Sequence, residues 1–159
     1  MKISTIMTPD DLIIGLKANS KKQVLQEITR TMTRHIEGCD QRVILDQLME
    51  RERLGCTGIG DGIAIPHARC PFSNEDQPPL ACLAILDQPI DYQAHDDKPV
   101  DIVFTLLAPE NIGGEHLTAL ALASRILRES DRAAQLRGCD NVDAAWSILT
   151  AESISSSAA

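Results

Sequence analysis

His67 is the residue of this chain whose type and position most clearly suggest chemistry. It follows Pro66 and a short apolar segment, residues 63–65, and a glycine-rich stretch lies just before that segment. A neutral imidazole offers one ring nitrogen as a nucleophile, and glycines let backbone N–H groups approach a bulky anion. The pattern therefore indicates a phosphoryl acceptor. An ordinary polar residue at the end of a strand is the alternative explanation.

Two other side chains could assist such chemistry. We expect His116 in the first turn of a helix, where free amide groups and the helix dipole favour a negative charge. Arg51 precedes the glycine-rich stretch, and its guanidinium could bind a phosphate in a fork. Either could instead be a surface residue, because the spacing does not show that the three side chains meet. His35 and His95 stand among charged or polar residues and are expected at the surface.

Two helices are predicted before the glycine-rich stretch. Ser20 and Gln23 have the spacing of a capping box, and this first helix should end near Gly38. Asp40 is a suitable N-cap for the second helix, which should end at Gly55. The buried faces are predicted to contain Val24, Leu25, Ile28, Met32 and Ile36 in the first helix, and Val43, Ile44, Leu45 and Leu48 in the second.

Three more helices are predicted towards the end of the chain. One should begin around Glu115, the next should be capped by Ser130 and end at Gly138, and the last should follow Asp140 or Asn141. The buried faces are predicted to contain Leu117, Leu120, Ala121, Ser124, Ile126 and Leu127 in the first of these, and Val142, Ala145, Trp146 and Leu149 in the last.

The strands interleave with these helices. Short strands are predicted at residues 11–17 and 63–65, interior strands at 80–86 and 100–107, a glycine-rich loop at 55–62, and a surface connection or edge hairpin at 87–99. The sequence therefore predicts the α/β class, with one three-layer domain in which helices flank a mixed β-sheet. We assign residues 1–152 to this domain and residues 153–159 to a disordered tail.

Residues 51–67 resemble a known active-site segment. They read Arg-Glu-Arg-Leu-Gly-Cys-Thr-Gly-Ile-Gly-Asp-Gly-Ile-Ala-Ile-Pro-His. This segment resembles the enzyme IIA domains of the mannitol/fructose class (EIIA type 2) of the bacterial phosphotransferase system, in particular the stand-alone nitrogen-regulatory members. The resemblance covers nearly the whole chain, from the strand near Leu12 to the final helix. Glu115-His116-Leu117 lies where the family carries its second active-site histidine.

The resemblance implies a site and a function. His67 would be phosphorylated on Nε2 by an HPr-like donor, His116 would stabilise the phosphoryl group, Arg51 would supply positive charge, and Thr57 with the backbone at Gly58 would belong to the phosphate pocket. The protein would regulate target proteins, such as a transporter or a kinase, through its phosphorylation state. The alternative is a sugar-specific enzyme IIA that passes phosphate to a IIB domain for carbohydrate uptake.

This sequence departs from the family pattern at several places. Cys56 stands where related sequences often have serine, and Ala68 replaces the glycine that usually follows the active histidine. Thr118 falls where some nitrogen-type members have another histidine, and residues 69–71 make the next loop unusual. The nucleophile is retained, so these changes bear on donor recognition.

Composition excludes several classes of function. The chain has 23 acidic and 15 basic residues, a formal charge of −8, which argues against nucleic acid as a partner. No segment approaches the roughly 20 apolar residues that a membrane span needs, and the first residues do not resemble a signal peptide, so we expect a cytoplasmic protein without membrane insertion. The five cysteines are odd in number and scattered, which favours free thiols.

Three other readings have less support. One is a binding module that no longer carries phosphate, although the retained His67 and His116 argue against it. Another is a metal site, whose candidate ligands are Cys56, His67, Cys70, His116 and Cys139, but their spacing matches no zinc pattern. A hydrolase is disfavoured because no nucleophile elbow is present. We therefore expect neither a metal nor a cofactor.

Overall fold

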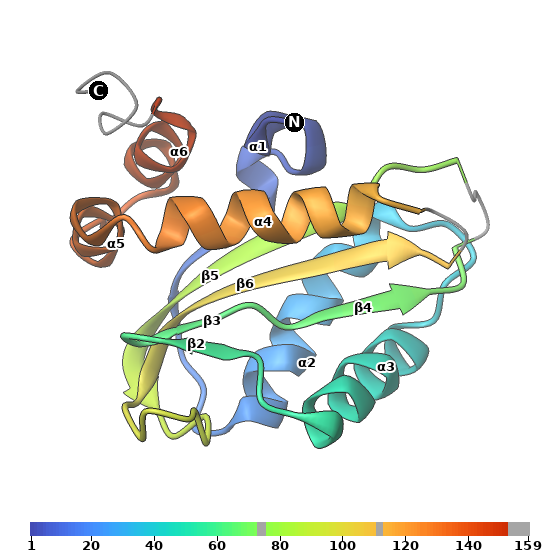
Figure 1. Cartoon of the computed structure of the whole chain (residues 1–159), viewed down its shortest axis with the longest axis horizontal. Coiled ribbons are helices and arrows are strands. Elements are labelled where there is room, and N and C mark those ends of the chain that lie inside the picture. The colour runs from blue at the N-terminus through green and yellow to red at the C-terminus, as the bar shows by residue number, and fades with distance from the viewer. Residues whose placement is uncertain (73–75, 111–112, 153–159) are drawn as a thin grey trace.

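A six-stranded mixed β-sheet forms the middle of the molecule in a computed structural model, which describes residues 1–72, 76–110 and 113–152. The strands are β1 (Leu12–Leu16), β2 (Gly58–Gly60), β3 (Ile63–Ala64), β4 (His67–Cys70), β5 (Leu80–Ile90) and β6 (Val100–Pro109). The helices are α1 (Ile3–Ile6), α2 (Lys21–Met32), α3 (Gln41–Leu54), α4 (Glu115–Leu127), α5 (Ser130–Arg137) and α6 (Val142–Thr150), with 3₁₀ turns at Pro9–Asp11 and Thr33–His35 (Figure 1).

Strands β5 and β6 are antiparallel neighbours at the centre of the sheet. Strand β1 runs parallel to β5, and the order continues from β6 to β3 and β2. Both β3 and β4 pair with β6 in parallel, β3 opposite Ile102 and Val103 and β4 opposite Leu106 and the residues after it. The chain thus follows one edge of β6 twice, which places His67 beside the end of that strand.

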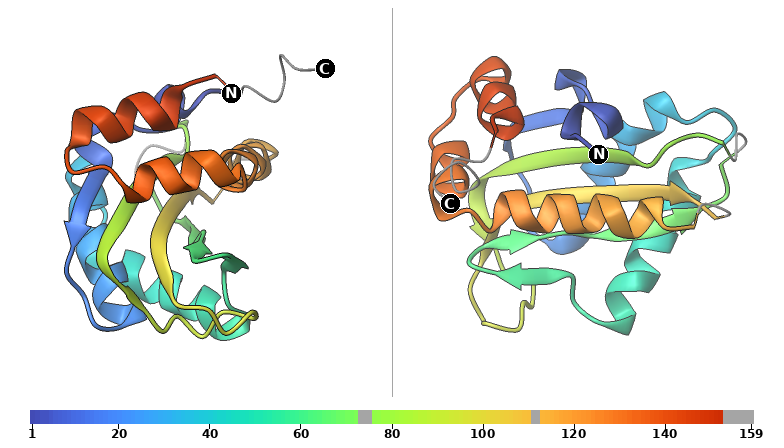
Figure 2. Two further views of the ribbon diagram at one scale, coloured as in Figure 1. Left: turned by 90° about the vertical axis from the view of Figure 1, so that its left-hand side faces the viewer. Right: turned by 45° about the horizontal axis from the view of Figure 1, so that its top comes forward.

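Alternate residues of the central strands supply two separate hydrophobic cores. In β6, Ile102, Phe104 and Leu106 belong to the core beneath α1, α4, α5 and α6. Val103 and Leu107 belong to the opposite core, beneath α2 and α3. All five side chains are fully buried, as expected of a strand covered on both faces. Figure 2 shows the two helical layers on either side of the sheet. The predicted three-layer α/β fold is confirmed.

Side-chain caps begin three of the helices as predicted. Ser20 Oγ accepts a hydrogen bond from the N–H of Gln23, at 3.2 Å, Asp40 Oδ1 accepts one from Arg42 and Asn141 Oδ1 one from Ala144. The prediction of a full capping box at Ser20 is wrong, because the Gln23 side chain accepts from the N–H of Asn19 rather than that of Ser20. The cap predicted at Ser130 is also wrong, since Ser130 is already the first residue of α5.

Helix α2 ends at Met32, earlier than the predicted end near Gly38. The hydroxyl of Thr31 bonds the carbonyl of Glu27, and that of Thr33 bonds the carbonyl of Arg30. Hydroxyls in such positions compete for the backbone acceptors and weaken a helix, and the chain continues as a 3₁₀ turn.

The glycine-rich segment forms a small hairpin and not the predicted loop. Strands β2 and β3 are antiparallel and are joined at Asp61 and Gly62, whose φ angles are 56° and 82°. Two consecutive residues with positive φ make the tight turn that best matches strand twist, and Asp-Gly is a favoured sequence for it. This hairpin brings the chain back to β6 just before His67.

The predicted buried face of α4 is wrong by about one residue in the first part of the helix, whereas Ile126 and Leu127 are buried as predicted. The buried side chains are His116, Ala119, Leu122, Ala123, Ile126 and Leu127, whereas Leu117 is 65% exposed. A polar residue, His116, occupies an inward position, so the apolar residues alone gave a rotated face. In α3, Val43 is likewise 39% exposed, although Ile44 and Leu48 are buried as predicted.

Two further results bear on the predicted organisation. Among the described residues, no helix is long and apolar enough to cross a membrane. The disordered tail predicted at residues 153–159 lies outside the described residues.

Candidate functional site

An open pocket lies at one end of β6, between the sheet and two helices. It has a volume of about 340 Å³ and is lined by Gln47, Glu50, Arg51, Leu54, His67, Ala68, Arg69 and His116. These residues come from the second half of α3, the start of β4 and the start of α4. In Figure 1, β4 lies between α3 and α4. The structure therefore brings together three predicted site residues, His67, His116 and Arg51, although they span 65 positions of the sequence.

The backbone on both sides of Pro66 positions the imidazole of His67. The carbonyl of Pro66 accepts a hydrogen bond from the N–H of Leu106, at 3.0 Å, which keeps this part of the chain on β6. The Nδ1 atom of His67 lies 2.8 Å from the carbonyl oxygen of Ile65. A carbonyl oxygen only accepts, so Nδ1 carries the hydrogen and Nε2 keeps a lone pair. The arrangement presents Nε2 as the nucleophilic atom.

The surroundings of His67 keep its ring neutral near pH 7. Burial is the main influence that lowers its pKa from the ordinary value, and the positive charge of Arg51 lowers it further. The bond to the Ile65 carbonyl and the negative charge of Glu52 oppose this change without reversing it. Only a neutral imidazole has a lone pair to attack phosphorus, so the net effect preserves the reactive form.

His116 faces His67 from the first turn of α4. The two ring centroids are 5.6 Å apart and the rings are tilted by 53°. His116 is 6% exposed, and its Nδ1 atom is buried without a hydrogen-bond partner among the described residues. Burial, His67 and Arg69 together lower its pKa to about 4. A buried polar atom without a partner is costly, and a phosphoryl oxygen or a water could relieve that cost.

This low pKa predicts a pH-dependent stability that originates at His116. The unfolded chain binds a proton there below about pH 6.5, whereas the folded protein does so only near pH 4. The free energy of unfolding should therefore fall as the pH falls through this window, by about 3 kcal/mol from this residue alone. Urea unfolding at about pH 7 and about pH 4.5 measures this loss, which His116→Gln should largely remove and His95→Gln should leave in place. An unchanged pH dependence in His116→Gln would contradict the prediction.

Arg51 lies in the last turn of α3, where its positive charge is favourable next to the free carbonyls of the helix end. One guanidinium nitrogen, Nη1, donates to the carbonyl of Gly55 at 2.8 Å. That bond holds the cation at the beginning of the glycine-rich segment, within the pocket that contains His67.

Thr57 and Gly58 do not line this pocket. Thr57 is buried, and its hydroxyl donates to Glu52 Oε1 and lies 3.2 Å from the hydroxyl of Tyr92. Gly58 packs against Ala94, and a Cβ atom added at Gly58 would lie 2.9 Å from the Cβ of that residue. The structure thus gives both residues packing partners beside the site.

A buried polar network beneath the pocket was missed by the sequence analysis. Glu52 is 8% exposed and accepts hydrogen bonds from Lys21 Nζ at 3.0 Å, the Tyr92 hydroxyl at 3.0 Å and the N–H of Thr57 at 3.3 Å. Lys21 Nζ also lies 4.4 Å from the centre of the Tyr92 ring. Burial and the charge of Glu52 raise the pKa of Tyr92 well above its ordinary value. Through the hydrogen bonds between Thr57 and Glu52, the network links the start of the glycine-rich segment to the end of α3.

Arg69 is a second residue that the sequence analysis missed. It lies two positions after His67 on β4 and lines the same pocket. The period of two along a strand could have indicated this, because residues i and i+2 project to the same side.

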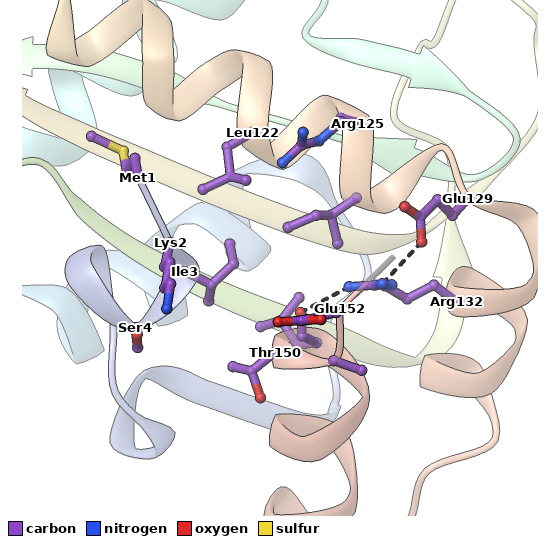
Figure 3. A pocket seen from close by; sticks show the side chains of 13 residues that line it. Met1, Lys2, Ile3, Ser4, Leu122, Arg125, Glu129, Arg132, Thr150 and Glu152 are labelled. Atoms are coloured by element: carbon purple, nitrogen blue, oxygen red, sulfur yellow. Dashed lines mark hydrogen bonds and ion pairs between the residues drawn. The ribbon is translucent and has the colours of Figure 1, made fainter. Parts of the chain in front are cut away.

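Another pocket lies beside the C-terminal half of α4 and has a volume of about 360 Å³ (Figure 3). Its wall includes Ile3, Leu122 and Arg132, and the guanidinium of Arg132 is bonded to Glu129 and to the carbonyl of Leu149. The described residues that line this pocket include no histidine or cysteine, so they offer no nucleophile comparable to His67. Among residues 1–72, 76–110 and 113–152, no group of histidine, cysteine and acidic side chains is arranged to hold a metal ion.

Comparison with known protein families gives one match that spans most of the chain. Residues 5–152 match the model of the family described as "Phosphoenolpyruvate-dependent sugar phosphotransferase system, EIIA 2". The protein belongs to this family. The EIIA type 2 assignment agrees with the resemblance seen in residues 51–67.

Similar proteins and solved structures support the assignment to the EIIA type 2 family. A nitrogen regulatory protein of Bradyrhizobium diazoefficiens is 41% identical over 149 residues, which cover 94% of this chain and 95% of the relative. The crystal structure of the nitrogen regulatory protein IIA-Ntr from Neisseria meningitidis has a TM-score of 0.82 and 30% identity, and the match covers 93% of this chain and 99% of that one. The IIA mannitol structure from Escherichia coli shares the fold, with a TM-score of 0.72 at 17% identity, over 90% and 98% of the two chains.

Proposed function

We propose that this EIIA type 2 protein is a phosphocarrier that accepts a phosphoryl group on Nε2 of His67 from an HPr-like protein. The observation that carries this proposal is the bond between Nδ1 of His67 and the Ile65 carbonyl, which leaves Nε2 as the available nucleophile in the pocket. Family membership supports the same chemistry.

The transfer step exchanges one phosphorus–nitrogen bond for another. As the lone pair of Nε2 of His67 attacks the phosphorus, the bond between phosphorus and the donor's histidine nitrogen breaks, and the donor ring keeps that electron pair. The ring of His67 gains positive charge in this step. The Ile65 carbonyl, which accepts the hydrogen of Nδ1, stabilises that charge. Return of the phosphoryl group to another protein reverses the same events.

The groups around His67 would stabilise the phosphoryl oxygens. Arg51 can donate two hydrogen bonds in a fork and balances the negative charge. His116 can donate a hydrogen bond from its ring, and the free N–H groups in the first turn of α4 add a positive partial charge. Burial of His116 strengthens these interactions, since the local dielectric constant is lower than in water.

We further propose that the protein acts as a regulator in the nitrogen-type branch of the system. The Bradyrhizobium and Neisseria relatives, at 41% and 30% identity, are nitrogen regulatory proteins, which supports this branch. Its phosphorylation state would then control target proteins, such as a transporter or a kinase, in the cytoplasm. A role as a sugar-specific enzyme IIA remains the competing function, because that class shares the fold.

Two sequential transfers test this proposal. The protein is first mixed with a phosphorylated HPr-like protein, and intact-mass spectrometry is expected to detect one added phosphoryl group. A sugar-specific IIB domain is then added, and onward transfer is expected to be slow. No mass increase in the first step would contradict the phosphocarrier function, whereas rapid transfer to the IIB domain would replace the regulatory role by sugar uptake.

A further inference from the structure

Arg69 lines the pocket with His67 and His116, yet it has no part in the transfer step described above. Along β4, Ala68 and Cys70 are buried, whereas His67 is half-buried and Arg69 exposed, which is the alternation expected of a strand with one covered face. Residues two apart on a strand have Cα atoms roughly 7 Å apart and project to the same side. The guanidinium of Arg69 can therefore reach a phosphoryl group on His67.

Among the described residues, the hydrogen bonds of the Arg69 guanidinium are long, and their acceptors are uncharged backbone carbonyls. Its Nη1 and Nη2 atoms donate to the carbonyls of Glu110 and Gly113 at 3.4 and 3.5 Å, which is long for a hydrogen bond. The corresponding bond of Arg51 is 2.8 Å. Arg69 takes part in none of the ion pairs found within the described part of the chain. A cation held in this way can move to an anion at little cost.

A phosphoryl group on His67 would create a need for such a cation. It brings a charge of about −1.5 to −2 into a half-buried position. Arg51 supplies one positive charge, and His116 is neutral near pH 7. Glu50 also lines the pocket, but its negative charge is paired with Arg53, whose Nη1 lies 2.9 Å from Glu50 Oε2. The positive charge of Arg69 already acts on the site, since it helps to lower the pKa of His116.

We propose that Arg69 is a phosphate-binding residue, which leaves the carbonyls of Glu110 and Gly113 and binds the phosphoryl oxygens once His67 is phosphorylated. The proposal rests on the function proposed for His67. Arg51 and Arg69 approach the phosphoryl group from α3 and β4, and together they balance its two negative charges. Because Glu110 and Gly113 lie just before α4, the same movement releases Arg69 from the loop that precedes His116.

The ionisation of the phosphoryl group itself tests this proposal. The protein is phosphorylated with phosphoramidate, a small donor that needs no docking surface, and the ³¹P chemical shift is followed as the pH is varied. A bound cation favours the dianion, so Arg69→Gln should raise the phosphoryl pKa by about one unit. Arg69→Lys should retain most of the wild-type value. Arg42→Gln, which removes an exposed arginine of α3 that does not line the pocket, is the matched control and should leave the phosphoryl pKa unchanged.

The outcomes separate the two proposals. If wild-type His67 takes up no phosphoryl group, both the function proposed for His67 and the role of Arg69 are overturned. If wild-type His67 is labelled and Arg69→Gln has the wild-type phosphoryl pKa, the role of Arg69 alone is overturned. An equal rise in Arg69→Gln and Arg69→Lys would also overturn it, because loss of the loop anchor and not of charge would then be responsible.

Discussion

Replacement of His67 by alanine is expected to abolish phosphate uptake from an HPr-like donor, with a rate at least ~1,000-fold below that of the wild type. The variant loses the nucleophile itself, and the other histidine and the arginines among the described pocket residues cannot replace it. The His116 ring is buried with its Nδ1 enclosed, and the arginines cannot act as nucleophiles near neutral pH. Radiolabel transfer followed on a denaturing gel at neutral pH measures the rate.

A second histidine provides the control for this experiment. His95 is exposed and lies in the connection between β5 and β6, so His95→Ala should accept phosphate at the wild-type rate. His116→Ala should still be labelled but more slowly, because the nucleophile is intact while one stabilising group is lost. Wild-type labelling of a correctly folded His67→Ala would remove the basis of the proposed function.

Replacement of Glu52 by alanine is expected to lower the free energy of unfolding by about 3–5 kcal/mol. The carboxylate of Glu52 is the common acceptor for Lys21, Tyr92 and Thr57. Its removal leaves a largely buried ammonium group without its counter-charge and buried hydroxyls with fewer partners. The same change should loosen the end of α3, and with it Arg51. Urea unfolding at neutral pH measures the loss.

Glu50 offers a matched control on the same helix. It pairs with Arg53 at 2.9 Å, about the same distance as the pair of Glu52 and Lys21, but its side chain is 60% exposed compared with 3% for Glu52. Exposed ion pairs contribute little, so Glu50→Ala should cost less than about 1 kcal/mol. A loss in Glu52→Ala no greater than that in Glu50→Ala would show that the buried network does not hold this part of the fold.

Local patterns in the sequence predicted much of the architecture. Ser20, Asp40 and Asn141 cap helices because a short polar side chain at that position satisfies a free N–H group, which depends only on near neighbours. The apolar runs at residues 80–86 and 100–107 likewise predicted the central strands β5 and β6, since a strand covered on both faces must be apolar throughout.

The sequence-based predictions were wrong where contacts between distant parts of the chain determine which residues are buried. The face of α4 was misplaced because His116 is buried against the pocket of His67, which no hydrophobic pattern indicates. No local pattern indicates that Glu52 is buried, because its partner Tyr92 is 40 residues away. Arg69 was missed for a different reason. Around His67, the sequence predicts a short strand only at residues 63–65 and a loop at residues 69–71, so the register of Arg69 with His67 is seen only in the structure, where β4 covers both residues.

The site was easier to predict than its surroundings. His67, His116 and Arg51 were singled out by residue type and by the family resemblance, and the structure places all three around one pocket. Their roles in phosphate transfer remain proposals. The environment that sets their pKa values depends on burial and on the exact neighbours, which only the folded chain supplies.

The atom that carries phosphorus is the most direct test of the central proposal. The protein, labelled with ¹⁵N at histidine, is phosphorylated by an HPr-like donor and examined by ¹H–¹⁵N and ³¹P NMR. The hydrogen bond from Nδ1 to the Ile65 carbonyl predicts phosphorus coupled to Nε2 of His67, with Nδ1 still protonated. Phosphorus on Nδ1 of His67, or on His116, would contradict the proposed mechanism.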